Sequence, residues 1–228
     1  KMEEKIASKG KTVLWFRGFL NRLGGTLLDP RETFEQVIAE KRGFLEPLLI
    51  VFLSHGIQGA VIGSFIATII LGIWAFLGEW LGAAPHGLIV SIPIITFFVA
   101  FIAALILWVI LAGIAHLCAR YVFKGVGSFG QLFKLYGYAS VPYSLIVLAT
   151  VLIGINFSLS PLSLILGLIA IFWTVLTMIV AVDTNYKIGL GKAFISSFVG
   201  PMIVLLILFI ALWLILMGMG AMFGGVAT

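Results

Sequence analysis

Charged side chains are scarce in this sequence: only 10% of its 228 residues are Asp, Glu, Lys or Arg. Soluble domains carry about 25%. In their place, 62% of the residues are hydrophobic, and the mean hydropathy is +1.22. A folded soluble chain of this length could not cover so much apolar side chain, because a large share of its surface stays in water. This composition excludes a soluble globular enzyme and a disordered tail, and it indicates a polytopic helical membrane protein.

Cysteine is nearly absent as well, since Cys118 is the single one. No disulfide can form within the chain, which excludes a small scaffold held together by disulfides.

Long apolar runs are what the sequence has in abundance. A helix needs about 20 apolar residues to cross the hydrocarbon layer, and five runs reach that length. They predict an all-α bundle with five transmembrane helices. The expected spans are about 47–77, 92–118, 135–155, 162–182 and 193–217. The first run is too long to stand upright at 1.5 Å per residue, so it must tilt, project or break.

The few basic residues alternate between the connections. Of 14 Lys and Arg residues, nine precede residue 47, three follow the second run and two follow the fourth. The connections at about 78–91 and 156–161 hold none, nor does the tail after 217. Because cytoplasmic loops collect Lys and Arg, we expect a cytoplasmic N-terminus and a C-terminus outside.

Residues 1–43 form a separate cytoplasmic segment, ahead of a membrane domain at 44–228. Asp29-Pro30-Arg31-Glu32 predicts a helix start, with Asp29 as N-cap and Pro30 at the first helical position. Upstream, apolar residues from Val13 to Leu23 alternate with basic ones. This pattern fits a basic amphipathic helix on an anionic membrane surface, or a helix that packs on the end of the bundle.

Several short motifs together resemble the Yip family of Rab/Ypt-interacting membrane proteins. The third span carries Gly137-Tyr138 followed by Pro142, and Asp29-Pro30 with Phe34 precedes the first span. The five-span topology with the N-terminus inside also matches. Ala139 stands where eukaryotic members have Ser, and Gly43-Phe44-Leu45-Glu46-Pro47 differs from their Asp-Leu-Tyr-Gly-Pro element, so the resemblance is to a prokaryotic-type member. In eukaryotes the family implies vesicle traffic through small GTPases, and the departures in this sequence make GTPase binding doubtful. The resemblance to a prokaryotic-type member implies a prokaryotic cell membrane.

The third-span motif also has a physical reading. Pro142 removes a backbone donor and kinks a helix, Gly137 permits close approach, and Tyr138 and Tyr143 suit a membrane interface. The motif therefore predicts a packing hinge; the alternative is a notch that binds a partner.

Polar residues inside the spans are few. Ser54, His55 and Gln58 share one face of the first span, and His116 lies near the end of the second. They act either as hydrogen-bonding glue between helices or as the lining of a cavity for a proton, ion or small ligand. Two histidines do not make a metal site, and Glu46 and Asp183, at span ends, are expected to contact water.

Small residues at Gly59, Gly63 and Ala67 follow one ridge of the first span. That spacing allows close helix packing, either within the bundle or in a dimer.

We find no catalytic constellation, and we expect no cofactor, no metal and no nucleic-acid partner. The function expected from the sequence is a non-catalytic membrane-organising or partner-binding scaffold. Its partners would be the lipid bilayer, other proteins or a second copy. The alternative is a small channel or transporter that uses the face of Ser54, His55 and Gln58.

Overall fold

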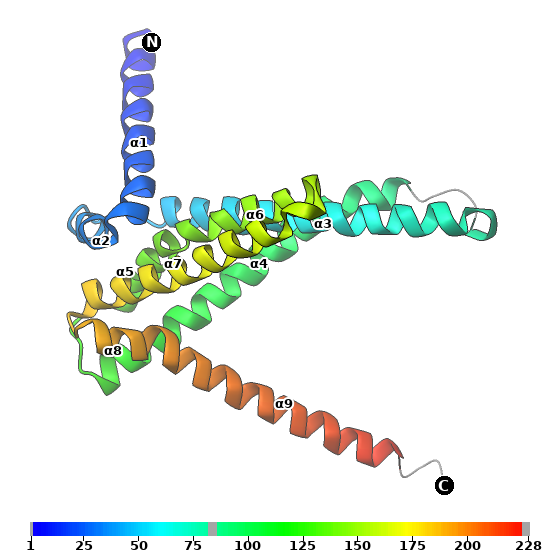
Figure 1. Cartoon of the computed structure of the whole chain (residues 1–228). Coiled ribbons are helices and arrows are strands. Elements are labelled where there is room, and N and C mark those ends of the chain that lie inside the picture. Colours follow the sequence, from blue (N-terminus) through cyan, green and yellow to red (C-terminus); the bar gives the residue numbers. More distant parts are fainter. Residues whose placement is uncertain (1, 82–85, 225–228) are drawn as a thin grey trace.

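Helices make up almost the whole chain. The computed structural model describes residues 2–81 and 86–224, is 91% helical and has no strand in that part, which confirms the all-α prediction (Figure 1). The helices are α1 (Met2–Leu28), α2 (Pro30–Ala39), α3 (Leu45–Leu81), α4 (His86–Leu117), α5 (Phe129–Ala139), α6 (Ser144–Ile155), α7 (Ser160–Tyr186), α8 (Leu190–Phe194) and α9 (Gly200–Gly224). Short 3₁₀ or π segments join some of them: η1 (Cys118–Val122), η2 (Val141–Tyr143), η3 (Phe157–Leu159) and η4 (Ile195–Val199).

Within the described residues, five helical stretches are long and apolar enough to cross a membrane, as the sequence predicts. They are Leu45–Leu77, Ile89–Val122, Phe129–Ile155, Phe157–Tyr186 and Leu190–Ile215. Each begins a few residues before the expected start, because a helix extends beyond its apolar run to a capping residue. Ser128, for example, accepts a hydrogen bond from the backbone of Gln131 at the start of α5.

The first span does not break, in spite of its length. α3 runs unbroken over 37 residues and extends beyond α6 (Figure 1). It packs along α4, and the two glycines of its small-residue ridge lie at that contact. A Cβ on Gly59 would collide with the carbonyl oxygen of Thr96, and one on Gly63 would lie 2.9 Å from Cα of Pro93. The structure therefore uses this ridge within the chain; Ala67 follows it and is buried.

Gly59→Ala is expected to destabilise the protein by about 1–3 kcal/mol, because a methyl group cannot enter this contact without moving α4. The matched control is Gly72→Ala in the same helix, where nothing lies within 4 Å of the added Cβ. The free energy of unfolding in bicelles, measured by steric trapping, distinguishes them. Equal changes in both variants would contradict the packing role.

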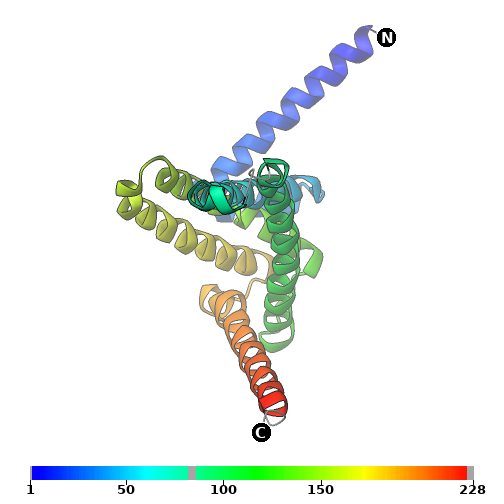
Figure 2. The same cartoon turned by 90° about the vertical axis from the view of Figure 1, so that its right-hand side faces the viewer.

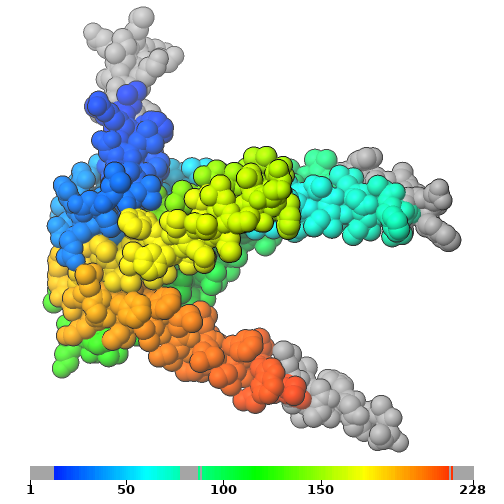
Figure 3. Space-filling model, viewed as in Figure 1, coloured from blue at the N-terminus to red at the C-terminus, as the bar shows by residue number. Residues whose placement is uncertain are grey.

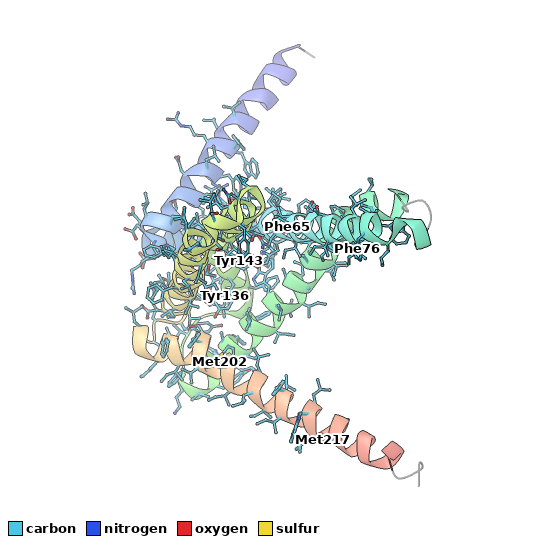
Figure 4. The ribbon with its side chains drawn as sticks, turned by 45° about the vertical axis from the view of Figure 1, so that its right-hand side comes forward. Phe65, Phe76, Tyr136, Tyr143, Met202 and Met217 are labelled. Carbon is cyan, nitrogen blue, oxygen red and sulfur yellow. The ribbon has the colours of Figure 1, made fainter. Side chains whose placement is uncertain are left out.

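The third span is divided at its motif. α5 ends at Ala139, η2 contains Pro142, and α6 continues from Ser144 to the end of the span. The chain therefore bends where the sequence predicts a kink. Tyr136 and Tyr143 lie in the interior beside this bend, whereas Phe76 and Met217 lie far out on α3 and α9 (Figure 4).

The spans diverge from one end of the molecule. α9 contacts the bundle near its start and then runs away from α3, which leaves the two as separate arms (Figures 1 and 3). Along α9, side chains such as Ile207, Phe209 and Leu214 are more than half exposed. These surfaces are apolar, as expected of helices that contact lipid.

The opposite end gathers the charges, and we call it the basic end. α1, α2, the α4–α5 connection and the α7–α8 connection meet there (Figure 1), and these segments contain nine of the 14 Lys and Arg residues. α2 begins as predicted: Asp29 Oδ1 accepts a hydrogen bond from the backbone N–H of Glu32 at 3.1 Å, and Pro30 is the first helical residue. Its apolar face buries Phe34 and Val37.

Candidate functional site

A buried carboxylate lies at the centre of the basic end. Glu46 is in the first turn of α3, where the helix dipole favours a negative charge, and only 4% of the residue is exposed. Pro47, which follows it, is fully buried. A carboxylate at this depth requires a cation or hydrogen-bond donors around it, because an unpaired buried charge is costly.

Arg22 supplies the cation from α1. Its Nε donates to Glu46 Oε2 at 2.8 Å and its Nη2 donates to Oε1 at 2.6 Å, a bidentate pair. Burial acts to lower the pKa of Arg22, but the hydrogen bonds and the charge of Glu46 raise that pKa above its ordinary value overall. Arg22 is therefore a fixed positive charge with 3% exposure.

Tyr138 completes the arrangement from α5. Its hydroxyl donates to Glu46 Oε2, and the ring is fully buried. Gly137 makes this approach possible: a Cβ there would collide with Pro47 and lie 2.7 Å from the Trp108 ring. We call Arg22, Glu46 and Tyr138 the ionic clamp, since they join α1, α3 and α5.

Two half-exposed side chains flank the clamp. Arg42 Nε donates to Glu40 Oε2 at 2.5 Å, and this hydrogen bond is the main cause that holds the pKa of Glu40 below its usual value. Glu40 also lies 3.8 Å from Arg22, and Arg42 lies 3.9 Å from Glu46. The two flanking charges cancel, so the cluster of four ionised groups is neutral.

A second ion pair attaches α2 to α7. The guanidinium of Arg31 contacts the carboxylate of Asp183, which is 6% exposed. The other carboxylate oxygen accepts the backbone N–H of Gly189 at 2.8 Å. Nearby, exposed Lys187 and Glu35 are 3.3 Å apart. Both non-spanning helices are thus fixed to the bundle through buried acids.

The expectation that Glu46 and Asp183 contact water is wrong. Both are buried, because the N-terminal helices fold over the span ends and bring arginines to them. Sequence reasoning missed Arg22 and Arg31 as their partners. One signal was available: acids are rare at the span ends, while basic residues are abundant in the segment ahead of them.

The motif residues occupy different positions around this site. Tyr138 is a clamp residue and Gly137 lies next to it. Pro142 is fully buried at the bend and does not contact the clamp residues through a hydrogen bond. Asp29 and Pro30 act one step away, since they start the helix that carries Arg31.

The three polar residues expected to share a face of the first span differ in their contacts. The Ser54 hydroxyl donates to the backbone oxygen of Ile50 at 2.7 Å. Gln58 Nε2 donates to Thr150 on α6 at 2.8 Å. The Gln58 bond joins α3 to α6 and so acts as polar glue between helices, whereas the Ser54 bond lies within α3.

His55 has a different environment. Its ring stacks on that of Tyr143, with the centroids 4.2 Å apart, and its Nδ1 lies 3.0 Å from the Ser54 hydroxyl. Both aromatic rings line a cavity of about 270 Å³, together with Ser140, Thr174 and apolar side chains of α3, α4 and α7. Of the polar set, only His55 reaches this cavity.

His116 does not join the His55 cavity. Its Nδ1 lies within hydrogen-bonding distance of the Tyr186 hydroxyl, and its ring contacts those of Phe129 and Tyr121 near the basic end. Within residues 2–81 and 86–224, no group of three or more His, Cys, Asp or Glu side chains is placed to hold a metal ion.

The fold and this site define a class: a multi-pass helical membrane protein with two further helices fixed to one end by buried ion pairs. The Yip1 domain profile matches residues 24–212. That range covers most of the chain, including α2, the clamp residues Glu46 and Tyr138, and most of α9. The chain therefore belongs to the Yip1 domain family. No match was found among curated proteins or among solved structures.

Proposed function

We propose that this Yip-type membrane protein is a non-catalytic scaffold that faces the cytoplasm with its basic end and binds a protein partner there, on α2. The ionic clamp is the observation that carries the proposal. The clamp attaches α1, a helix that does not cross the membrane, at the end where the positive-inside rule places the cytoplasm.

The energetics of buried ion pairs support a role in positioning. Desolvation of Arg22 and Glu46 consumes most of the gain from their attraction, so such a pair adds little net stability over apolar residues of similar size. Its geometry is nevertheless specific, because a bidentate guanidinium fixes both distance and orientation. A scaffold needs such a fixed surface, since a preorganised binding face loses less entropy on association.

The Arg31–Asp183 pair holds α2 on α7, and Glu40 at the end of α2 lies 3.8 Å from Arg22 of the clamp. The surface that these contacts position is the exposed side of α2. Phe34 and Val37 face the bundle, while Glu32, Glu35 and Ala39 are exposed or partly exposed. The exposed side is mixed in charge and polar, which is typical of non-obligate interfaces.

The test is photo-crosslinking in native membranes from a reactive amino acid at Ala39. The matched control is the same amino acid at Phe157, an exposed residue at the other end of the bundle. We expect an adduct of one defined mass at Ala39 alone, followed by binding of that purified partner to the reconstituted protein.

A clamp-free protein makes the test specific. Arg22→Met, Glu46→Leu and Tyr138→Phe together remove both charges and the hydroxyl. We expect partner affinity to fall about tenfold or more, equivalent to about 1.4 kcal/mol. Absence of an adduct from any exposed position of α2, or unchanged affinity without the clamp, would overturn the proposal.

The transport alternative has one observation in its favour, the cavity beside His55. Ser54 and Gln58 have direct protein partners instead, and apolar side chains form most of the cavity wall. We therefore favour the scaffold, and we expect proteoliposomes to show no proton or ion flux that His55→Leu abolishes.

A further inference from the structure

We infer that α1 is a surface anchor that lies on the anionic headgroups of the membrane in which the spans are embedded. The proposal concerns a different helix and a different partner from the scaffold function above, and three observations carry it.

The first observation is direction. α1 leaves the bundle crosswise to α3, both in Figure 1 and in the turned view of Figure 2. It begins to diverge at the level where α3 starts, because Arg22 of α1 and Glu46 of α3 are hydrogen-bonded there. A helix that runs across the spans at the level of their ends follows the membrane surface.

The second observation is an exposed apolar stripe. Val13, Phe16 and Leu20 are 63%, 53% and 49% exposed, and their spacing of three and four residues places them on one face of α1. On the neighbouring face, Trp15 stacks on Phe19, which is buried against the bundle. Isolated exposed apolar residues are ordinary, but an aligned set indicates a surface that meets another apolar phase.

The third observation is charge. Residues 1–28 contain six Lys or Arg and only two acids, Glu3 and Glu4. The clamp neutralises Arg22, and Arg17 remains exposed one residue beyond Phe16. An apolar stripe accompanied by basic residues is the pattern of helices that bind anionic lipid surfaces.

The clamp makes this anchor geometrically possible. A free amphipathic segment could leave the bundle in any direction, whereas Arg22 ties the last third of α1 to the start of α3. Hydrogen bonds within α1 keep the helix regular from Arg22 to its end: the Thr26 hydroxyl donates to the backbone oxygen of Arg22 at 2.8 Å, and the backbone N–H of Asp29 donates to the carbonyl of Gly25 at 2.7 Å. Headgroup contact then requires no further folding.

The test places a nitroxide label on the whole protein in nanodiscs. Cys118→Ala removes the single native cysteine, and Phe16→Cys or Asn21→Cys introduces the labelling site. Phe16 belongs to the apolar stripe, while exposed Asn21 lies about 140° around the helix from it at 3.6 residues per turn. The second label is therefore the matched control.

We expect the Phe16 label to contact lipid and the Asn21 label to contact water, as measured by accessibility to oxygen and to a water-soluble nickel complex. The contrast should appear in mixtures of phosphatidylcholine with phosphatidylglycerol and weaken in phosphatidylcholine alone. Arg17→Gln should lower the ratio of docked to free α1 about fivefold, because one basic residue near an anionic surface is worth about that factor.

Two outcomes would overturn the inference. Equal water accessibility of both labels in anionic nanodiscs would show that α1 stands free of the membrane. Protection of the Phe16 label that does not depend on anionic lipid or on Arg17 would show that another contact covers the stripe. Neither outcome bears on partner binding by α2, so the two proposals fail separately.

Discussion

Arg22→Met is expected to lower the free energy of unfolding by about 3–5 kcal/mol, because it leaves the Glu46 carboxylate buried without its cation. Tyr138 would remain as a single hydroxyl donor, which cannot replace a bidentate guanidinium. Steric trapping in bicelles measures this loss. Arg17→Met is the matched control: it removes the same charge from an exposed position on the same helix, and we expect a change of less than about 0.5 kcal/mol.

The clamp-free protein gives the opposite result for stability. With Arg22→Met, Glu46→Leu and Tyr138→Phe combined, no charge of the clamp remains to be desolvated, and we expect stability equal to wild type or higher by about 1–4 kcal/mol. Loss of stability equal to that of Arg22→Met alone would contradict this account. Recovered stability together with lost partner binding would separate positioning from folding.

Hydrogen exchange provides a second readout of the same clamp. Without Arg22, we expect faster amide exchange in α1 near Thr26 and little change within α7, because the clamp supplies the side-chain hydrogen bonds from α1 to α3. Uniformly faster exchange in all helices would indicate general unfolding instead.

Much of this architecture follows from local pattern. The five spans are visible as apolar runs, because the hydrocarbon layer sets their length. Asp29 and Pro30 start α2 as predicted, and Pro142 falls at the bend, since capping and proline geometry depend on a few neighbouring residues. The resemblance carried by Gly137 and Tyr138 led to the correct family.

The contacts between distant segments could not be derived in the same way. Arg22 and Glu46 are 24 residues apart, and Arg31 and Asp183 are 152 apart. No periodicity links such pairs, and the place of each acid at a span end predicts water contact for both. Burial of the two acids depends on how the N-terminal segment packs on the membrane domain. Local sequence patterns describe each of these two parts separately and say nothing of the contact between them.

The same limit applies to the polar face of the first span. Ser54, His55 and Gln58 share a helical face by spacing, yet only Gln58 is hydrogen-bonded to another helix, while Ser54 and His55 contact each other. Gln58 donates a hydrogen bond to Thr150 of α6, and the ring of His55 stacks on that of Tyr143. The bend at Pro142 sets where α6 begins relative to α3. Which neighbour each of these side chains contacts therefore depends on tertiary packing, which the pattern of a single helix does not reveal.

Gly137→Ala is the second substitution for which we expect a large effect, a loss of about 1–3 kcal/mol or more from overpacking. The added methyl group would collide with Pro47 and approach Trp108 to 2.7 Å. Neither neighbour can move easily. Pro47 lies in the first turn of α3, and Trp108 is buried with its Nε1 donating to the carbonyl of Phe133 at 2.9 Å. Relief of the collision requires α5 to move away from α3.

Movement of α5 would also open the clamp, because Tyr138 is the next residue and its hydroxyl contacts Glu46. Gly137→Ala should therefore combine lower stability with faster amide exchange in α1, far away along the chain. Gly130→Ala is the matched control in α5, since nothing lies within 4 Å of its added Cβ and alanine favours the helix. If both variants lost equal stability, or if exchange in α1 stayed unchanged in Gly137→Ala, the Gly-Tyr pair would not act as one unit. The expected difference gives the two residues of the motif separate roles. Gly137 allows α5 to pack closely against α3, and Tyr138 then binds the Glu46 carboxylate on α3.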